Sequence, residues 1–182
     1  FSVIFFNLII FNVYSNDQIT FDVSEIEILD GGNKIIGKNR GSIITNNGVT
    51  IEADKFEFDK IKNILKAQGN IKVKDKLNNY DFNAQKISYF KDKEKIEIEG
   101  KAEALIGSNY RFITQDINIL RNEMIISSDI GATILDTINQ TRYEIGKFSY
   151  SLKEEILKGE KIFINTKYNE PFSDKFFFKN AI

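Results

Sequence analysis

The chain has 182 residues, of which 42% are apolar and 13% aromatic, and its formal net charge is −1. It contains no histidine and no cysteine, which excludes Ser-His-Asp and Cys-His catalysis, disulfides and the usual zinc sites. The near-neutral charge argues against nucleic acid as a partner. Abundant β-branched and aromatic residues with a single proline instead predict a folded, strand-rich protein.

The chain begins with an uncharged apolar segment, residues 1–14, in which Phe, Ile, Leu and Val predominate. This segment is shorter than the ~20 residues of a membrane-spanning helix but has the length of the apolar region of a signal peptide. Val13, Tyr14 and Ser15 fit a cleavage site. We therefore expect residues 1–15 to be a signal peptide without its first residues, removed after Ser15 on export. A buried strand or an uncleaved anchor helix is the alternative.

Five ten-residue windows then repeat along the chain, and they begin at Ile19, Val49, Tyr80, Tyr110 and Thr141. Places one, three, five, eight and ten of these windows are apolar in 23 of 25 cases. Alternation at places one to five, and again at eight and ten, is typical of a strand with one buried face. The three-residue step from place five to place eight keeps that face inward only if the strand bends there, as at a β-bulge. Each window is predicted to be a strand with a bend in its middle.

A polar turn and a second strand follow each window. The second strand is clearest at residues 63–73 and 94–104, where Gly69 and Gly100 are equivalent. Gly41 and Gly159 mark weaker copies, and the fourth repeat shows no clear equivalent. Two strands per ~30 residues make a hairpin, and stacked bent hairpins give two facing walls joined along a folded edge. The predicted fold class is all-β, a V-shaped solenoid of bent β-hairpins.

The inward places would line an apolar trough with large walls and a small floor. Periodicity alone leaves two interpretations open: a filled core inside a closed sandwich, or a groove for a long apolar ligand. If the trough is a groove, its candidate lining residues are Phe21, Val23, Ile26, Ile51, Ala53, Phe56, Phe82, Ala84, Ile87, Phe112, Ile117, Tyr143 and Phe148.

One pair of segments resembles a known family. ADKFEFD at 53–59, followed by AQGNIKV at 67–73, resembles the recurring signature of the organic-solvent-tolerance (OstA-like) domain. The lipopolysaccharide-transport proteins LptA, LptC and the N-terminal part of LptD share this domain. The resemblance runs from about Ile19 to Phe178 and is sharpest in the second repeat. The fourth repeat departs from it, with Thr114 in place of the alanine and no Gly-Asn pair.

The resemblance implies a β-jellyroll over residues 19–182 that is open along one edge and lies in the periplasm of a Gram-negative cell. Its groove would carry the acyl chains of lipopolysaccharide toward the outer membrane by binding alone, with no catalytic residue, metal or cofactor. The terminal strand at Ile19–Ile28 would pair head-to-tail with another domain of this family.

The end of the chain helps to choose within the family. Residues 169–178 fit a sixth window, with Pro171 at place three and Phe176 and Phe178 at places eight and ten. A solenoid that ended at Ile182 would expose an apolar edge, so we expect a longer parent protein. This favours the N-terminal domain of LptD, which precedes an outer-membrane barrel, over a stand-alone LptA-like bridge.

Two other functions compete with lipid transport. A carbohydrate-active β-solenoid enzyme would need paired carboxylates, but Glu25, Asp54 and Asp116 fall at outward corners and converge on no cleft. A surface solenoid with a filled core would need no site at all. We expect the protein not to be an enzyme.

Overall fold

The computed structural model describes residues 20–44, 49–75, 80–106, 109–151, 153–154 and 156–182, so the predicted signal peptide lies outside the described residues. Within them, thirteen strands form one sheet, and two short 3-10 helices, η1 (Asp30–Gly32) and η2 (Lys91–Lys93), lie in turns. The strands are β1 (Thr20–Leu29), β2 (Lys34–Ile44), β3 (Val49–Ala53), β4 (Lys55–Asp59), β5 (Ile64–Asp75), β6 (Tyr80–Phe90), β7 (Lys95–Ile106), β8 (Tyr110–Leu120), β9 (Ile125–Ser128), β10 (Ala132–Asp136), β11 (Thr141–Ser151), β12 (Ile156–Asn165) and β13 (Lys175–Ala181).

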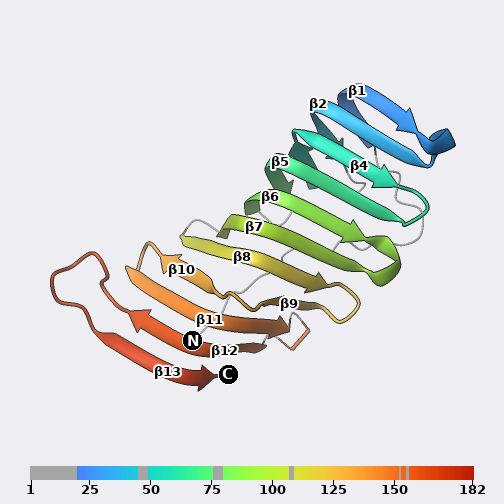
Figure 1. The fold of residues 1–182 in the computed structure, drawn as a ribbon. Coiled ribbons are helices and arrows are strands. Elements are labelled where there is room, and N and C mark those ends of the chain that lie inside the picture. The colour runs from blue at the N-terminus through green and yellow to red at the C-terminus, as the bar shows by residue number, and fades with distance from the viewer. Residues whose placement is uncertain (1–19, 45–48, 76–79, 107–108, 152, 155) are drawn as a thin grey trace.

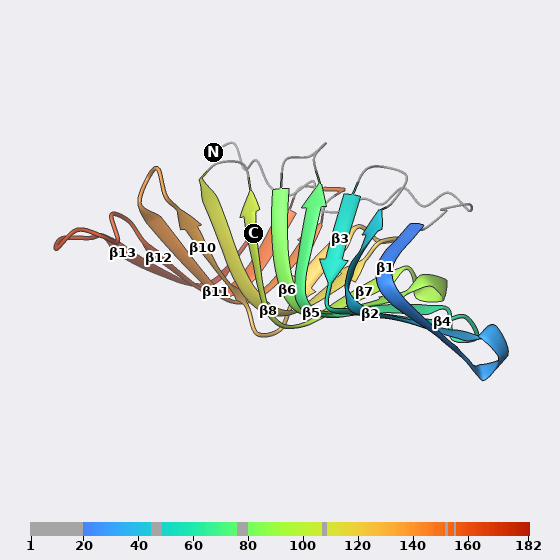
Figure 2. The same ribbon diagram turned by 90° about the horizontal axis from the view of Figure 1, so that it is seen from above.

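The sheet is folded along its middle into two walls. Most strands bend and run through both walls (Figures 1 and 2). Wall A contains β3, β10, the first halves of β1, β6, β8 and β11, the second halves of β2, β5, β7 and β12, and most of β13. Wall B contains β4, β9 and the remaining halves. The predicted fold class, all-β with bent hairpins stacked into an open, V-shaped β-jellyroll, is confirmed.

The bends lie at the predicted step between places five and eight. The pairing register shifts between Val23 and Glu25 in β1 and between Asn83 and Lys86 in β6, and the second window breaks into β3 and β4 at Asp54. On the second strands the backbone turns through the left-handed region, for example at Gly69 with φ 79°. Glycine adopts this region without steric cost, which explains the glycine of the second-strand pattern.

The fourth repeat does have a second strand, contrary to the sequence interpretation. It is split into β9 and β10, and the break contains Gly131, which follows Gly100 by the same 31 residues that separate Gly100 from Gly69. A Cβ at Gly131 would lie 1.9 Å from the carbonyl oxygen of Ile145. Only glycine allows the neighbouring strand to approach this closely, so the glycine marks the bend although the flanking pattern has diverged.

The predicted sixth window is placed wrongly. Residues 166–174 form a long connection closed by a hydrogen bond from Thr166 N to the carbonyl oxygen of Asp174 (3.0 Å), and β13 begins only after it. In the sheet, Phe176 lies opposite Ile164 and Phe178 opposite Ile162. The two phenylalanines therefore occupy places three and five, because the longer connection delays the strand by five residues.

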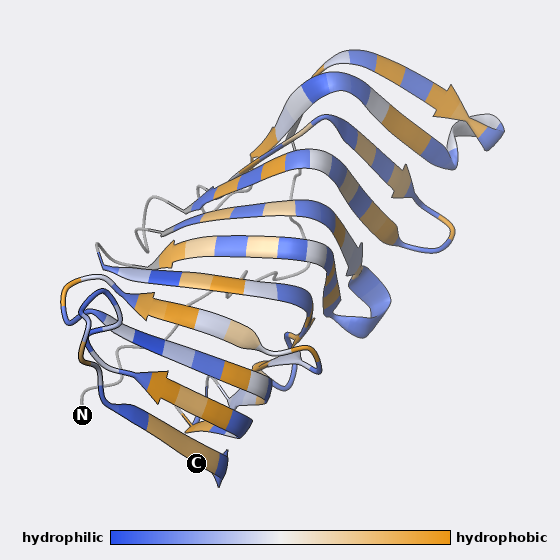
Figure 3. Ribbon diagram, turned by 60° about the vertical axis from the view of Figure 1, so that its left-hand side comes forward, coloured by the Kyte–Doolittle hydropathy of each residue, from blue (hydrophilic) through white to orange (hydrophobic). Residues whose placement is uncertain are grey.

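The inward rows form one continuous apolar core. Along each strand apolar and polar residues alternate, with the alternation interrupted at the bend (Figure 3). Side chains close to the bend, such as Ala53, Phe56 and Ala102, are fully buried. Side chains farther from the bend, such as Leu65 and Tyr143, are only half-buried against this core. Burial thus decreases from the folded edge toward the free rims of the two walls.

Candidate functional site

The space between the walls is the candidate site, and its two sides touch. The rings of Phe112 and Phe148 meet edge to face, with centroids 6.0 Å apart and an interplanar angle of 88°. Phe112 belongs to the wall A half of β8 and Phe148 to the wall B half of β11, so this aromatic pair joins the two walls across the interior. The interior is closed at this point by the protein's own side chains.

Little empty space is left beside the aromatic pair. A wholly apolar cavity of about 20 Å³ lies there, room for about one water molecule. A long apolar ligand could enter at this level only if the walls parted or the side chains repacked. The cavity is lined by Phe112, Ile126, Ile134, Ile145, Phe148, Tyr150 and Leu157.

The predicted groove residues share the inward face of the folded sheet. The buried members are Ala53, Phe56, Phe82, Ala84, Phe112, Ile117 and Phe148. The partly buried members are Val23, Ile51, Ile87 and Tyr143. Ile26, on the terminal strand β1, is 54% exposed, and the side chain of Phe21 lies outside the described part. The structure brings the buried and partly buried members into one interior, and contact between the predicted residues and a ligand stays a prediction.

Sequence reasoning omitted several half-buried residues of the interior. These residues lie near the rims at or opposite places one, three and ten, and they include Leu65, Tyr89, Tyr110, Leu157 and Ile164, all half-buried against the core. Their apolar character was visible in the sequence. Places one and ten lie farthest from the bend, which by itself indicates a position at the mouth of the trough.

The inward rows are also accessible at the two ends of the sheet. At the first end, Ile26 and Ile28 of β1 are 54% and 65% exposed. At the other end, Phe176 and Phe178 of β13 are 48% and 45% exposed. Among the described residues, each end strand pairs with one neighbour, β1 with β2 and β13 with β12. The apolar interior therefore runs from end to end of the sheet and is uncovered at both.

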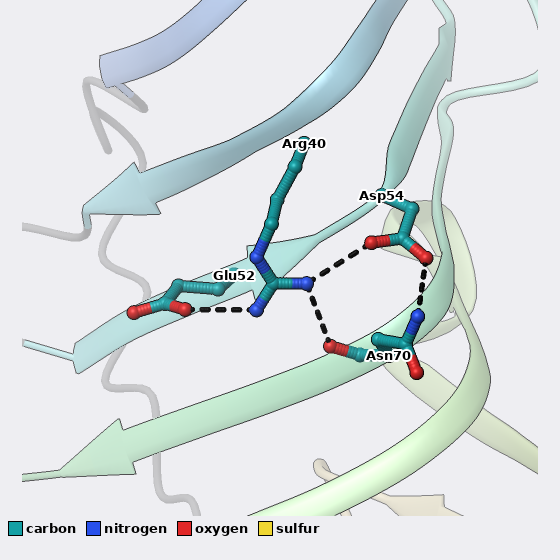
Figure 4. Close-up of polar contacts among 4 residues, drawn as sticks. All are labelled: Arg40, Glu52, Asp54 and Asn70. Atoms are coloured by element: carbon teal, nitrogen blue, oxygen red, sulfur yellow. Dashed lines mark hydrogen bonds and ion pairs between the residues drawn. The ribbon is translucent and has the colours of Figure 1, made fainter.

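The two signature residues Asp54 and Asn70 meet on the outer side of the bend (Figure 4). Asn70 Nδ2 donates to Asp54 Oδ2 at 2.7 Å, and Arg40 Nη1 donates both to Asp54 Oδ1 at 3.0 Å and to the carbonyl oxygen of Asn70 at 3.2 Å. Arg40 Nη2 pairs with Glu52 Oε2 at 3.0 Å. This cluster, which we call the corner clasp, ties three consecutive strands of the bend together. Asp54 and Asn70 thus fix the bend from outside the interior, whereas other signature residues, such as Ala53 and Phe56, are buried inside it.

A second polar cluster joins two turns at the rim of wall B. Tyr89 Oη donates to Glu94 Oε1 at 2.9 Å, and Arg121 Nη1 lies 2.7 Å from Glu94 Oε2. The guanidinium of Arg121 also lies over the Tyr89 ring, 5.4 Å from its centroid. Burial, together with the Glu94 carboxylate, raises the pKa of Tyr89 to about 12. The cluster holds a half-buried mouth residue in place.

The acidic residues at the corners are engaged in structural bonds. Glu25 accepts a hydrogen bond from Asn39 Nδ2 at 2.9 Å, and Asp116 accepts one from the backbone N–H of Gly100 at 2.7 Å. In the described part of the chain, no group of three or more acidic side chains is arranged to hold a metal ion. Within the same ranges, no helix has the length and apolar character needed to cross a membrane.

No protein-family model and no curated protein matches the sequence. Among solved structures, the chain is similar to LptH of Pseudomonas aeruginosa, described as the LptA-homologous periplasmic component of the lipopolysaccharide transport device, at 10% sequence identity and a TM-score of 0.31. The match covers 87% of this chain and 93% of that one. A superposition this loose carries no argument about function.

Proposed function

We propose that this protein is a periplasmic lipopolysaccharide-transport component of the Lpt type, which holds lipid acyl chains between its two walls. The observation that carries the proposal is the inward apolar row, which crosses consecutive strands from β1 to β13 and is exposed at both ends. The Asp54 and Asn70 pair supports the architecture that the resemblance implies, because in this chain it has a defined structural role at the bend.

Such a protein acts by binding. Burial of an acyl chain is worth about 0.8 kcal/mol per CH₂, so a chain between the walls does not escape into water. Each repeat offers a similar apolar surface, which allows the lipid to move along the sheet without a deep trap. The half-buried rim residues, such as Leu65 and Tyr89, would contact the lipid first. Insertion then separates contacts such as that between Phe112 and Phe148.

The two end strands are the proposed contacts with partner proteins. In the part of the chain that the structure describes, β1 and β13 each have one edge without a strand partner, and exposed apolar side chains lie on both strands. Pairing of such an edge with a strand of another domain of this kind would continue the sheet and the interior. Disulfide trapping between a cysteine at Glu27 on β1 and one on the terminal strand of a candidate partner tests this. Absence of a product between two folded proteins would contradict head-to-tail pairing.

Two members of this class are candidates: the N-terminal domain of an LptD-like protein associated with the outer membrane, which we put first, and a stand-alone LptA-like bridge. The coding sequence beyond Ile182 distinguishes them. A long series of alternating strands with aromatic girdles would identify the barrel of an LptD-like protein, and an early stop codon would identify the bridge.

One observation favours a different function, that of a structural solenoid with a filled core. The cavity beside Phe112 has a volume of only about 20 Å³, so at this level the described side chains fill the interior and leave no room for a ligand. Photo-crosslinkers at the inward Phe82 and Phe112 separate the two functions, with the outward neighbours Asn83 and Arg111 as matched controls. Lipopolysaccharide adducts at the inward positions alone support transport. Equal labelling at inward and outward positions, or no labelling at all, would exclude transport and favour the structural solenoid.

A further inference from the structure

Two neighbouring turns at the rim of wall B carry a repeated pair of lysines. The β4–β5 turn contains Lys60 and Lys62, and the β6–β7 turn contains Lys91 and Lys93, each 31 residues farther along the chain. A hydrogen bond from Lys91 N to the carbonyl oxygen of Asn63 (3.1 Å) joins the two turns, which lie side by side in Figure 1. We call these four residues the lysine rim.

The acidic residues of the same turns are occupied by other partners. Asp59 Oδ1 accepts the backbone N–H of Lys62 at 2.9 Å, and Asp92 Oδ1 accepts Asn63 Nδ2 at 2.6 Å. The third carboxylate, Glu94, is bound by Tyr89 and Arg121. These bonds stabilise the turns and hold the negative charges against the protein.

The lysine ammonium groups, by contrast, are available to a ligand. Among the described residues, no carboxylate lies within ion-pair distance of Lys60, Lys91 or Lys93. Lys62 has only a loose contact, 3.5 Å from Asp59, and its side chain is 71% exposed. The rim therefore presents several positive charges to solvent in a chain whose net charge is −1.

The lysine rim borders the mouth of the apolar interior. Phe58 and Leu65, which pair across the β4–β5 hairpin, lie just inside the first turn, and Tyr89 lies just inside the second. Ile61, between Lys60 and Lys62, is 75% exposed. A molecule with its acyl chains between the walls would thus have its polar head at the level of these ammonium groups.

We infer that the lysine rim binds the phosphate groups on the head group of a lipid whose acyl chains lie between the two walls. This inference rests on the proposed lipid-binding function and adds to it the side chains that recognise the head group. Lysine binds phosphate as a mobile point charge, which suits a head group that passes from one repeat to the next. Because these charges are exposed, salt screens the interaction.

The test compares the wild-type protein with the K60Q/K62Q/K91Q/K93Q variant in equilibrium titrations. The probes are lipid A with both phosphates, fully dephosphorylated lipid A with the same acyl chains, and inorganic pyrophosphate. A matched control removes the same charge from four exposed lysines on the outer faces of the walls: Lys66, Lys72, Lys74 and Lys158. Far-UV circular dichroism checks folding, and the two double variants K60Q/K62Q and K91Q/K93Q serve if the quadruple variant does not fold.

We expect the rim variant to bind phosphorylated lipid A about tenfold to a hundredfold more weakly than the wild type and the control, and with a weaker salt dependence. All three proteins should bind dephosphorylated lipid A equally, and Lys→Arg changes at the rim should restore binding. Equal affinity of rim variant and control for phosphorylated lipid A would overturn the inference while lipid binding stood. Competition by pyrophosphate as strong as that by lipid A would show a free-phosphate site instead. Failure of the wild type to bind either lipid would refute the proposed function as well.

Discussion

Replacing Phe112 by alanine tests whether the two walls meet in solution. Phe112 is buried, its ring contacts Phe148 of the opposite wall, and the small apolar cavity lies beside it. Removal of a buried phenylalanine side chain costs about 3–5 kcal/mol, of which an edge-to-face contact accounts for about 0.5–1.5 kcal/mol. We therefore expect Phe112→Ala to lower the free energy of unfolding by about 3–4 kcal/mol.

Urea unfolding followed by far-UV circular dichroism measures this loss, since the chain contains no tryptophan. Phe177→Ala is the matched control, because Phe177 is exposed on β13 and its loss should cost less than about 1 kcal/mol. Under the proposed function, Phe112→Ala should also bind lipid more tightly per folded molecule, because the contact that an inserted acyl chain would have to separate is already absent.

The reasoning would be refuted by a Phe112→Ala loss below about 1 kcal/mol, which would mean that wall B does not cover Phe112 in solution. A double-mutant cycle with Phe148→Ala adds a separate criterion. Residues in contact show a coupling energy of about 0.5–3 kcal/mol, whereas additive losses would show that the rings do not touch.

Three further changes test other parts of the structure. In Gly131→Ala the new Cβ would lie 1.9 Å from the Ile145 carbonyl oxygen. Urea unfolding should therefore show a larger loss of unfolding free energy than in Gly100→Ala, where the left-handed backbone alone costs about 1–2 kcal/mol. Equal losses in the two variants would refute the close approach. Burial alone would raise the pKa of Asp136, but hydrogen bonds from neighbouring amides, chiefly that from Asn139 N, outweigh it and lower this pKa. The stabilisation by the Asp136 carboxylate is present above its unfolded-state pKa of about 4 and is lost as pH falls through its folded-state pKa. The stability of Asp136→Asn should therefore fall less steeply with decreasing pH than that of the wild type. Identical pH dependence in the two proteins would contradict this. Because the pKa of Tyr89 is raised to about 12, its neutral side chain should stabilise the protein below pH ~10, and this stabilisation should be lost as the pH rises to ~12. Tyrosinate absorbance of the wild type and of Tyr89→Phe measures this. Full ionisation of all tyrosines by pH ~11 would contradict the raised pKa.

The walls and bends could be predicted from the sequence because every stacked repeat is subject to the same physical constraint. Each window must bury alternate side chains and reverse its phase once, so Ala53 and Ala84 fall at equivalent places and are both buried. One failure occurred where this constraint is absent. The connection before β13 lies outside the sheet, and no burial pattern fixes its length, so Phe176 was placed five residues out of register.

The candidate site is only partly predictable from sequence. Periodicity shows that Phe112 and Phe148 face inward, but not that their rings meet, since this depends on the angle between the walls. The arrangement of the lysine rim likewise depends on the turns lying side by side, which the hydrogen bond from Lys91 N to Asn63 provides. Repeated spacing of charged residues at turns is a signal that could have indicated it.

The corner clasp has a consequence for how proteins of this shape are recognised. Asp54 and Asn70 bond to each other and to Arg40 outside the bend, while the inward surface contains no polar group of the clasp. The clasp therefore constrains the geometry of the bend, and the inward rows set the size of the interior. Chains could share the clasp and still differ in the size of the interior through places three, five and eight. Finding the clasp in a sequence would then indicate the architecture, and the inward rows would indicate what the interior can hold.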